Sequence, residues 1–85
     1  MKIFTYTIKD DKGLHARPAG LLVKEAKMFN SKITIEANDK IADLKRIFAI
    51  MSLGVKFGTP ITITIDGEDE EAAAIALEYH IRTNL

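Results

Sequence analysis

The stretch Pro60-Ile61-Thr62-Ile63-Thr64-Ile65-Asp66 decides the fold class of this 85-residue chain. Three isoleucines alternate with two threonines, which is the period-two pattern of a strand with one buried and one exposed face. This is the clearest strand pattern in the sequence, and its β-branched content predicts a central place in a sheet. The rest of the chain must supply neighbouring strands and a layer that covers the isoleucines.

Three further strands are predicted before this segment. Apolar and polar side chains alternate over residues 4–8, which predicts a strand at about residues 2–9 that ends at the polar break 10–13. Residues 33–36 repeat the alternation and lead through Asn38-Asp39 into a short strand at residues 40–42. Because Asn and Asp suit tight turns between strands, the last two segments are expected to form a hairpin.

Three other segments have helical spacing. Residues 16–29 carry Pro18 in the first turn, where its missing N–H costs nothing, and residues 44–53 form a shorter segment that ends near Gly54. The last helix begins in the acidic run 66–71, which complements the helix dipole, and runs to about Arg82. The predicted packing positions are Ala19, Leu22, Val23, Ala26 and Phe29 in the first helix, and Ala74, Leu77 and Ile81 in the last.

The resulting order is β-α-β-β-α-β-α. The economical architecture for this order is an α+β open-faced β-sandwich, in which three helices cover one face of a four-stranded antiparallel sheet. The length and the lack of repeats or linkers predict a single domain over residues 1–85. A small core and no deep enzyme cleft are expected, so function should lie on the loops.

Composition excludes several classes of function. The 12 basic and 12 acidic residues balance, which disfavours nucleic acid as a partner, and no segment has the length of apolar sequence that membrane insertion requires. The chain has no cysteine, so neither a disulfide framework nor a thiolate zinc site is expected. With no signal-like apolar run at the start, we expect a cytoplasmic protein.

The segment Gly13-Leu14-His15-Ala16-Arg17-Pro18-Ala19-Gly20 places a histidine where a loop becomes a helix. The first backbone N–H groups of a helix have no internal partner and lie at the positive end of its dipole, so those of Ala16 and Arg17 would stabilise a nearby anion. The Arg17 guanidinium is suited to phosphate oxygens. An unperturbed imidazole is substantially neutral at neutral pH and can attack a phosphorus centre, so His15 could carry a phosphoryl group.

Other interpretations of this segment remain open from the residues alone. An arbitrary His-x-Arg pair is more often a surface histidine beside a solvated charge than a site. Several anion-binding roles would also fit a histidine and an arginine at a helix start.

The same segment, Gly-Leu-His-Ala-Arg-Pro-Ala, closely resembles the active-site signature of the HPr family. Met51-Ser52-Leu53-Gly54 and the acidic stretch 66–70 resemble later HPr segments at similar spacing, so the likeness covers essentially the whole chain. The resemblance implies an HPr-like fold and a phosphocarrier of the sugar phosphotransferase system. His15 would be phosphorylated on Nδ1 by enzyme I, with phosphoenolpyruvate as the original donor, and would pass the group to IIA domains of sugar permeases.

A docking surface is expected beside His15. If the short helix lies beside the first one, Ile47, Phe48 and Met51 would form an exposed apolar patch, although Ile47 or Met51 could instead pack in the core. The resemblance places partner contacts at these positions, with Lys24 and Lys27 as a polar rim. Gly20 departs from the family pattern, weakens the helix, and would allow close partner approach.

Arg46 stands where many HPr proteins have a regulatory serine. It has no hydroxyl, so phosphorylation by HPr kinase is not expected at this position. It also puts a cation near a helix N-terminus, which costs about 1 kcal/mol unless that helix begins earlier, as at Asp43.

The remaining expectations concern catalytic roles, metals and cofactors that the sequence does not predict. His80 and Arg82 lie near the end of the last helix with no expected catalytic role, and the acids 68–71 are expected to form a solvated helix start rather than a metal site. We expect no metal, no cofactor and a monomeric carrier rather than a stand-alone enzyme. The alternatives are a regulatory module in a nitrogen-linked or transcriptional pathway, and an anion-binding domain that is not phosphorylated.

Overall fold

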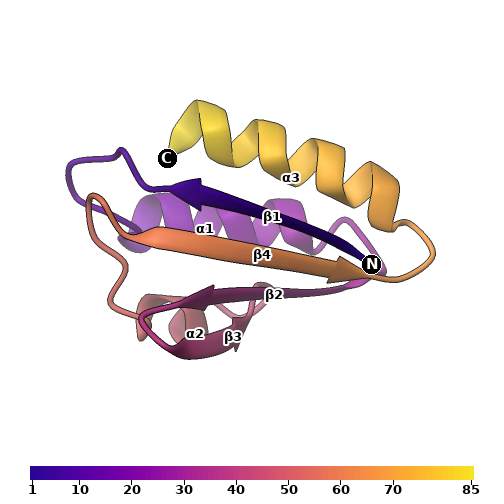
Figure 1. The fold of residues 1–85 in the computed structure, drawn as a ribbon, viewed down its shortest axis with the longest axis horizontal. Helices are drawn as coiled ribbons and strands as arrows, with labels where there is room; N and C mark the ends of the chain where they lie inside the picture. The colour runs from indigo at the N-terminus through magenta and orange to yellow at the C-terminus, as the bar shows by residue number, and fades with distance from the viewer.

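The computed structural model describes all residues from 1 to 85. Its elements are β1 (Lys2–Thr7), α1 (Ala16–Ala26), β2 (Lys32–Ala37), β3 (Lys40–Asp43), α2 (Ile47–Met51), β4 (Pro60–Asp66) and α3 (Glu70–Asn84). The strands form one antiparallel sheet in the order β1-β4-β2-β3, and the three helices lie on the same side of it (Figure 1). The predicted fold class and element order are confirmed.

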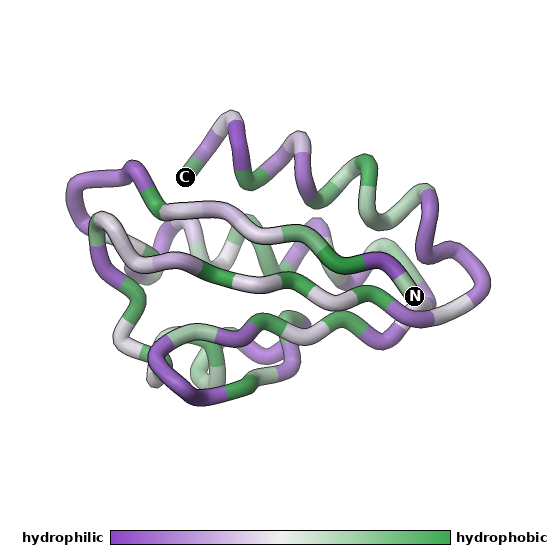
Figure 2. The backbone as a smooth tube through the Cα atoms, viewed as in Figure 1, coloured by the Kyte–Doolittle hydropathy of each residue, from purple (hydrophilic) through white to green (hydrophobic).

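The central strand β4 has the two faces that its sequence predicts. Ile61, Ile63 and Ile65 point into the helix layer and are fully buried, while Thr62 and Thr64 lie on the open face of the sheet. Ile63 pairs with Phe4 of β1 on one side and with Ile35 of β2 on the other. Burying each isoleucine contributes about 1.5 to 3 kcal/mol, so this alternation orients the sheet. Figure 2 shows the alternating hydropathy along the strands.

The helix α1 buries the stripe that its spacing predicts but ends three residues early. Ala19, Leu22, Val23 and Ala26 are buried, whereas Phe29 lies beyond the helix and is only partly buried. The N–H groups of Asn30 and Ser31 donate to the carboxylate of Asp69 instead of continuing the helix. The Lys45 ammonium donates to the carbonyl oxygens of Phe29 and Ser31, which stabilises the turn that follows.

The hairpin between β2 and β3 forms as predicted. Asn38 and Asp39 both have positive φ angles, 53° and 65°, which is the conformation of a two-residue turn between antiparallel strands. The side-chain amide of Asn38 also donates to the carbonyl oxygen of Leu53 at 2.8 Å. The turn is thereby attached to the segment that follows α2.

The second helix is shorter than predicted and does not begin early. Asp43 still pairs with Thr34 as the last residue of β3, and the N–H of Leu44 donates to the carbonyl of Ile33. The helix therefore does not begin at Asp43 or Leu44, because the backbone of these residues pairs with β2. Arg46 is the N-cap, with extended φ and ψ of −124° and 107° and no capping hydrogen bond from its side chain.

The first strand and the last helix end within a few residues of the predicted boundaries. β1 stops at Thr7, two residues before the predicted end, and α3 runs to Asn84. Leu77 and Ile81 are buried as predicted, but the third buried position of α3 is Ala73, and Ala74 is only partly covered.

None of the three helices combines the length and the apolar composition that crossing a bilayer demands.

Candidate functional site

The loop before α1 is held in place by the segment before β4. Gly13 has a φ of 69°, and a Cβ there would overlap the carbonyl oxygen of Val55 and lie 2.6 Å from Cα of Lys56. The N–H of Leu14 donates to that same Val55 carbonyl at 3.0 Å, and the Leu14 side chain is buried. Only glycine fits at position 13, and His15, two residues later, is therefore presented at a defined place.

His15 is the N-cap residue of α1. Its backbone is extended, its carbonyl accepts the N–H of Ala19 at 2.9 Å, and its side chain makes no capping hydrogen bond. The N–H groups of Ala16 and Arg17 have no acceptor in the chain, and Pro18 has no N–H to satisfy. The site therefore offers an imidazole, two free backbone donors and the positive end of a helix dipole.

Arg17 is exposed and makes no ion pair with any acidic residue. Its guanidinium is thus available to an anion that arrives from outside. A shallow pocket of about 250 Å³ lies here, and it is lined by Asp10, His15, Arg17, Pro18, Leu21 and Asn84. The structure places His15 and Arg17 in one pocket, as the sequence predicts, together with lining residues that the sequence did not reveal.

Three of these lining residues were missed by the sequence reasoning. The sequence indicates Asp10 only as part of the polar break after β1, yet its Oδ1 atom lies 4.0 Å from Nε2 of His15. Asn84 reaches the pocket from the end of α3, and the exposed Leu21 lies one turn into α1. An acid five residues before the histidine was visible in the sequence, but the direction of its side chain depends on the turn between them.

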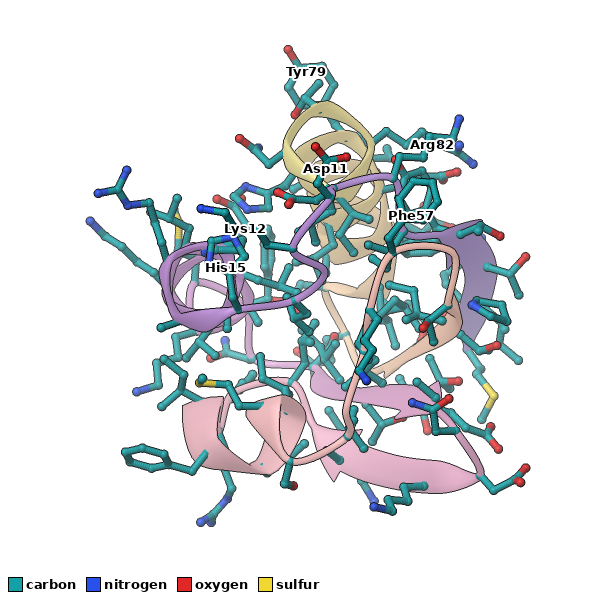
Figure 3. The ribbon with its side chains drawn as sticks, turned by 90° about the vertical axis from the view of Figure 1, so that its left-hand side faces the viewer. Asp11, Lys12, His15, Phe57, Tyr79 and Arg82 are labelled. Atoms are coloured by element: carbon teal, nitrogen blue, oxygen red, sulfur yellow. The ribbon has the colours of Figure 1, made fainter.

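Figure 3 views the end of the molecule at which His15 lies. Phe57 is exposed at this end, on the loop that leads to β4, and was also not singled out from the sequence. Its turn is held by hydrogen bonds from the N–H of Gly58 to the carbonyl of Ile8, and from the N–H of Ile8 to the carbonyl of Thr59. An apolar residue just before a glycine in a connecting loop was the signal that could have found it.

The predicted docking residues lie on α1 and α2, which pack against each other, except Lys27, which is the C-cap residue of α1. Phe48 is 85% exposed and Met51 is 38% exposed, whereas Ile47 is half-buried against the core. A Cβ on Gly20 would lie 3.7 Å from Cδ1 of Ile47, so the partly exposed Gly20 lies beside α2. The apolar patch is therefore centred on Phe48 and Met51.

The charged rim of this surface is largely basic. Lys24, Lys27 and Arg46 are all exposed, and the only ion pair among them joins Nε of Arg46 to Asp43 at 3.7 Å. Because this pair is exposed and long, it contributes little to stability. Figure 3 shows α2 below α1 on the same side of the sheet.

The acidic start of α3 has a structural role away from His15. The Ser31 hydroxyl donates to the Asp69 carboxylate, and the N–H groups of Asn30 and Ser31 donate to it as well. These hydrogen bonds hold the pKa of Asp69 below its ordinary value. His80 is half-buried on α3, and its carbonyl accepts a hydrogen bond from the Asn84 side chain.

Comparison with known proteins gives one consistent result. The family model described as "PTS HPr component phosphorylation site" matches residues 3–83. The phosphocarrier protein HPr of Mycoplasma capricolum is 49% identical over 78 residues, which covers 92% of this chain and 88% of that protein.

Solved structures agree with this match. The histidine-containing phosphocarrier protein of a Mycoplasma superimposes with a TM-score of 0.93 and 45% identity, over 96% of this chain and 93% of that one. An HPr from Thermoanaerobacter tengcongensis gives a TM-score of 0.92 and 44% identity, over 98% and 93% of the two chains. The chain belongs to the HPr family, the phosphocarrier proteins of the phosphotransferase system.

Proposed function

We propose that His15 accepts a phosphoryl group on Nδ1 from enzyme I, with phosphoenolpyruvate as the original donor, and passes it to IIA domains of sugar permeases. One observation carries the residue assignment. His15 is the N-cap of α1, and the N–H groups of Ala16 and Arg17 beside it have no acceptor. A phosphate on the ring would find donors and a favourable dipole there.

The chemistry requires little of the protein itself. In each transfer the imidazole lone pair forms a bond to phosphorus while the bond from phosphorus to the donor breaks, and the reverse occurs on delivery. The exposed Arg17 guanidinium offsets phosphate charge, and no cofactor is needed. Since phosphoryl transfer depends on positioning and charge stabilisation, each partner protein completes the site.

The partner surface is proposed to be the α1–α2 face. The apolar contact would come from Phe48 and Met51 with the exposed edge of Ile47, while Lys24 and Lys27 supply a basic rim. Gly20, whose missing side chain lies over Ile47, lets the partner approach the two helices closely. An acidic partner surface with an apolar centre fits this arrangement.

Arg46 removes one form of control in this proposal. It occupies the N-cap of α2 with its side chain exposed, and it has no hydroxyl that a kinase could modify. The carrier would therefore act without regulation by serine phosphorylation at this position.

We infer that the carrier is a cytoplasmic monomer. An HPr from Thermoanaerobacter tengcongensis has been solved as a dimer, with a TM-score of 0.77 and 44% identity to this chain. Light scattering distinguishes the two states, because a monomer has a mass of 9.5 kDa and a dimer twice that mass. A dimer at micromolar concentration would contradict the inference.

Incubation with enzyme I and phosphoenolpyruvate tests the function. Wild-type protein should gain one phosphoryl group, detected by mass spectrometry under non-acidic conditions, and His15→Ala should gain none. Equal labelling of both proteins would exclude His15 as the acceptor. Normal labelling with no onward transfer to any IIA domain would favour a regulatory module instead.

A further inference from the structure

The Asp10 carboxylate is fixed in place beside the His15 ring. Its Oδ1 atom accepts the N–H of Lys12 at 2.9 Å, and the Asp10 carbonyl accepts the N–H of Gly13 at 3.0 Å. The N–H of Asp10 donates to the Leu85 oxygen at 2.8 Å. One hydrogen bond therefore holds the carboxylate itself, and two more hold the backbone of Asp10, which together restrict where this carboxylate lies.

The same Oδ1 atom lies 4.0 Å from Nε2 of His15, and the two side chains are 28% and 39% exposed. A neutral imidazole carries its proton on one nitrogen and a lone pair on the other. A carboxylate that faces Nε2 attracts an N–H at that nitrogen and repels a lone pair there. The tautomer with the proton on Nε2 and the lone pair on Nδ1 is thus favoured.

We propose that Asp10 is a positioning residue that keeps the His15 proton on Nε2 and makes Nδ1 the nucleophile. The consequence for phosphoryl transfer depends on the proposed function, but the tautomer preference does not. When Nδ1 bonds to phosphorus and the donor bond breaks, Nε2 keeps its proton and the ring gains positive charge. Asp10 offsets that charge, and on delivery the electron pair of the N–P bond returns to Nδ1.

A purely structural role for Asp10 makes a different prediction. If the carboxylate only stabilises the turn to Lys12, Asp10→Asn should change nothing, because the amide oxygen can accept the same N–H. If its charge acts on the ring, Asp10→Asn should change the tautomer while the loop remains folded. Asp10→Asn is therefore the informative substitution, and Asp10→Ala would mix the two effects.

Asp11 provides a matched control. It is the adjacent acid and is exposed, and in Figure 3 its side chain lies on the α3 side of the loop, apart from the His15 ring. Asp11→Asn removes the same charge from the same loop. Any change that arises from net charge alone should be the same in both variants.

The experiment measures the tautomer by ¹⁵N NMR of the histidine ring nitrogens, at a pH where the ring is neutral. Wild-type protein and Asp11→Asn should show His15 mainly with the proton on Nε2, and Asp10→Asn should shift population toward Nδ1–H. The initial rate of labelling by enzyme I should fall about two- to fivefold in Asp10→Asn, the size of an exposed charge interaction. Added salt should reduce this difference.

An unchanged tautomer distribution in Asp10→Asn would overturn the proposal, even if labelling slowed. An equal shift in Asp11→Asn would overturn it as well. Failure of enzyme I to label wild-type protein would instead refute the proposed function, and the NMR result would stand independently.

Discussion

The N–H of Leu14 donates to the carbonyl oxygen of Val55 at 3.0 Å, which joins the loop that presents His15 to the segment that precedes β4. The two loops are more than forty residues apart in sequence but lie at the same end of the sheet (Figure 1). Because the central strand anchors one of them, the position of the histidine depends on the whole fold. This contact makes Gly13 a sensitive residue.

Gly13→Ala should destabilise the protein by at least about 2 kcal/mol, because it combines a positive φ with an overlap against Val55. Gly58→Ala is the control, since Gly58 has a φ of 84° but no atom within 4 Å of its added Cβ. It should cost only the conformational strain, about 1 kcal/mol. Urea unfolding measures both, and equal losses would show that the Val55 contact contributes nothing.

Gly20→Ala should stabilise the protein by about 0.5 to 1 kcal/mol, because alanine is the better helix former. The added Cβ would lie 3.7 Å from Cδ1 of Ile47, which is ordinary van der Waals contact. Thermal unfolding measures the gain. If Gly20 also serves partner approach, the KM for enzyme I should rise in this more stable variant; a lower stability would contradict the packing.

Phe48→Ala should raise the KM for a partner protein about tenfold, the cost of removing an interface anchor, while the free energy of unfolding stays nearly unchanged. Phe48 is 85% exposed, so it contributes little to the core. Ile41→Ala is the matched control, because Ile41 is an exposed apolar residue on β3. Similar kinetic losses in both variants would argue against a docking surface on α2.

Arg46→Ser should create a substrate for HPr kinase, whereas the wild-type protein should not be modified. The backbone of Arg46 already has the extended conformation of an N-cap, so the serine hydroxyl can cap α2 and should add about 1 kcal/mol of stability. Mass spectrometry and urea unfolding measure the two effects. Modification of wild-type protein at Ser31, which is buried and bonded to Asp69, or at Ser52 would contradict this prediction.

Stability should fall in acid because of Asp69. Hydrogen bonds from the Ser31 hydroxyl and from the N–H groups of Asn30 and Ser31 lower the pKa of Asp69 in the folded protein below 3.8. As the pH falls, the unfolded chain therefore binds the proton first. The stabilisation is complete above the pKa of Asp69 in the unfolded chain, and it is lost as the pH falls through the pKa of Asp69 in the folded protein. Urea midpoints from about pH 6 to about pH 2 measure the loss.

Two variants isolate the contribution of Asp69 to this acid sensitivity. Asp69→Asn should be less stable at neutral pH and should show a shallower decline in acid. Glu68→Gln, which alters an exposed acid in the same loop, should retain the wild-type decline. The same shallow decline in both variants would assign the effect to net charge.

Most elements of the fold could be predicted from the sequence because their patterns are local. The alternation in β4, the stripe of α1 and the Asn38-Asp39 turn each depend on a few neighbouring residues. The start of α2 could not be predicted, because pairing of Asp43 with Thr34 decides it. That competition is between residues nine positions apart, beyond what helical spacing reveals.

By itself, the sequence determined the fold class and the family, and it indicated His15 and Arg17 as the candidate site, because these residues are neighbours at a helix start that their own pattern specifies. Only the tertiary structure decided which groups surround that pair. Asp10 lies beside the imidazole because of its turn, Asn84 comes from the other end of the chain, and Val55 holds the loop from the segment that precedes β4. Such contacts depend on packing between distant segments, and local periodicity carries no information about them.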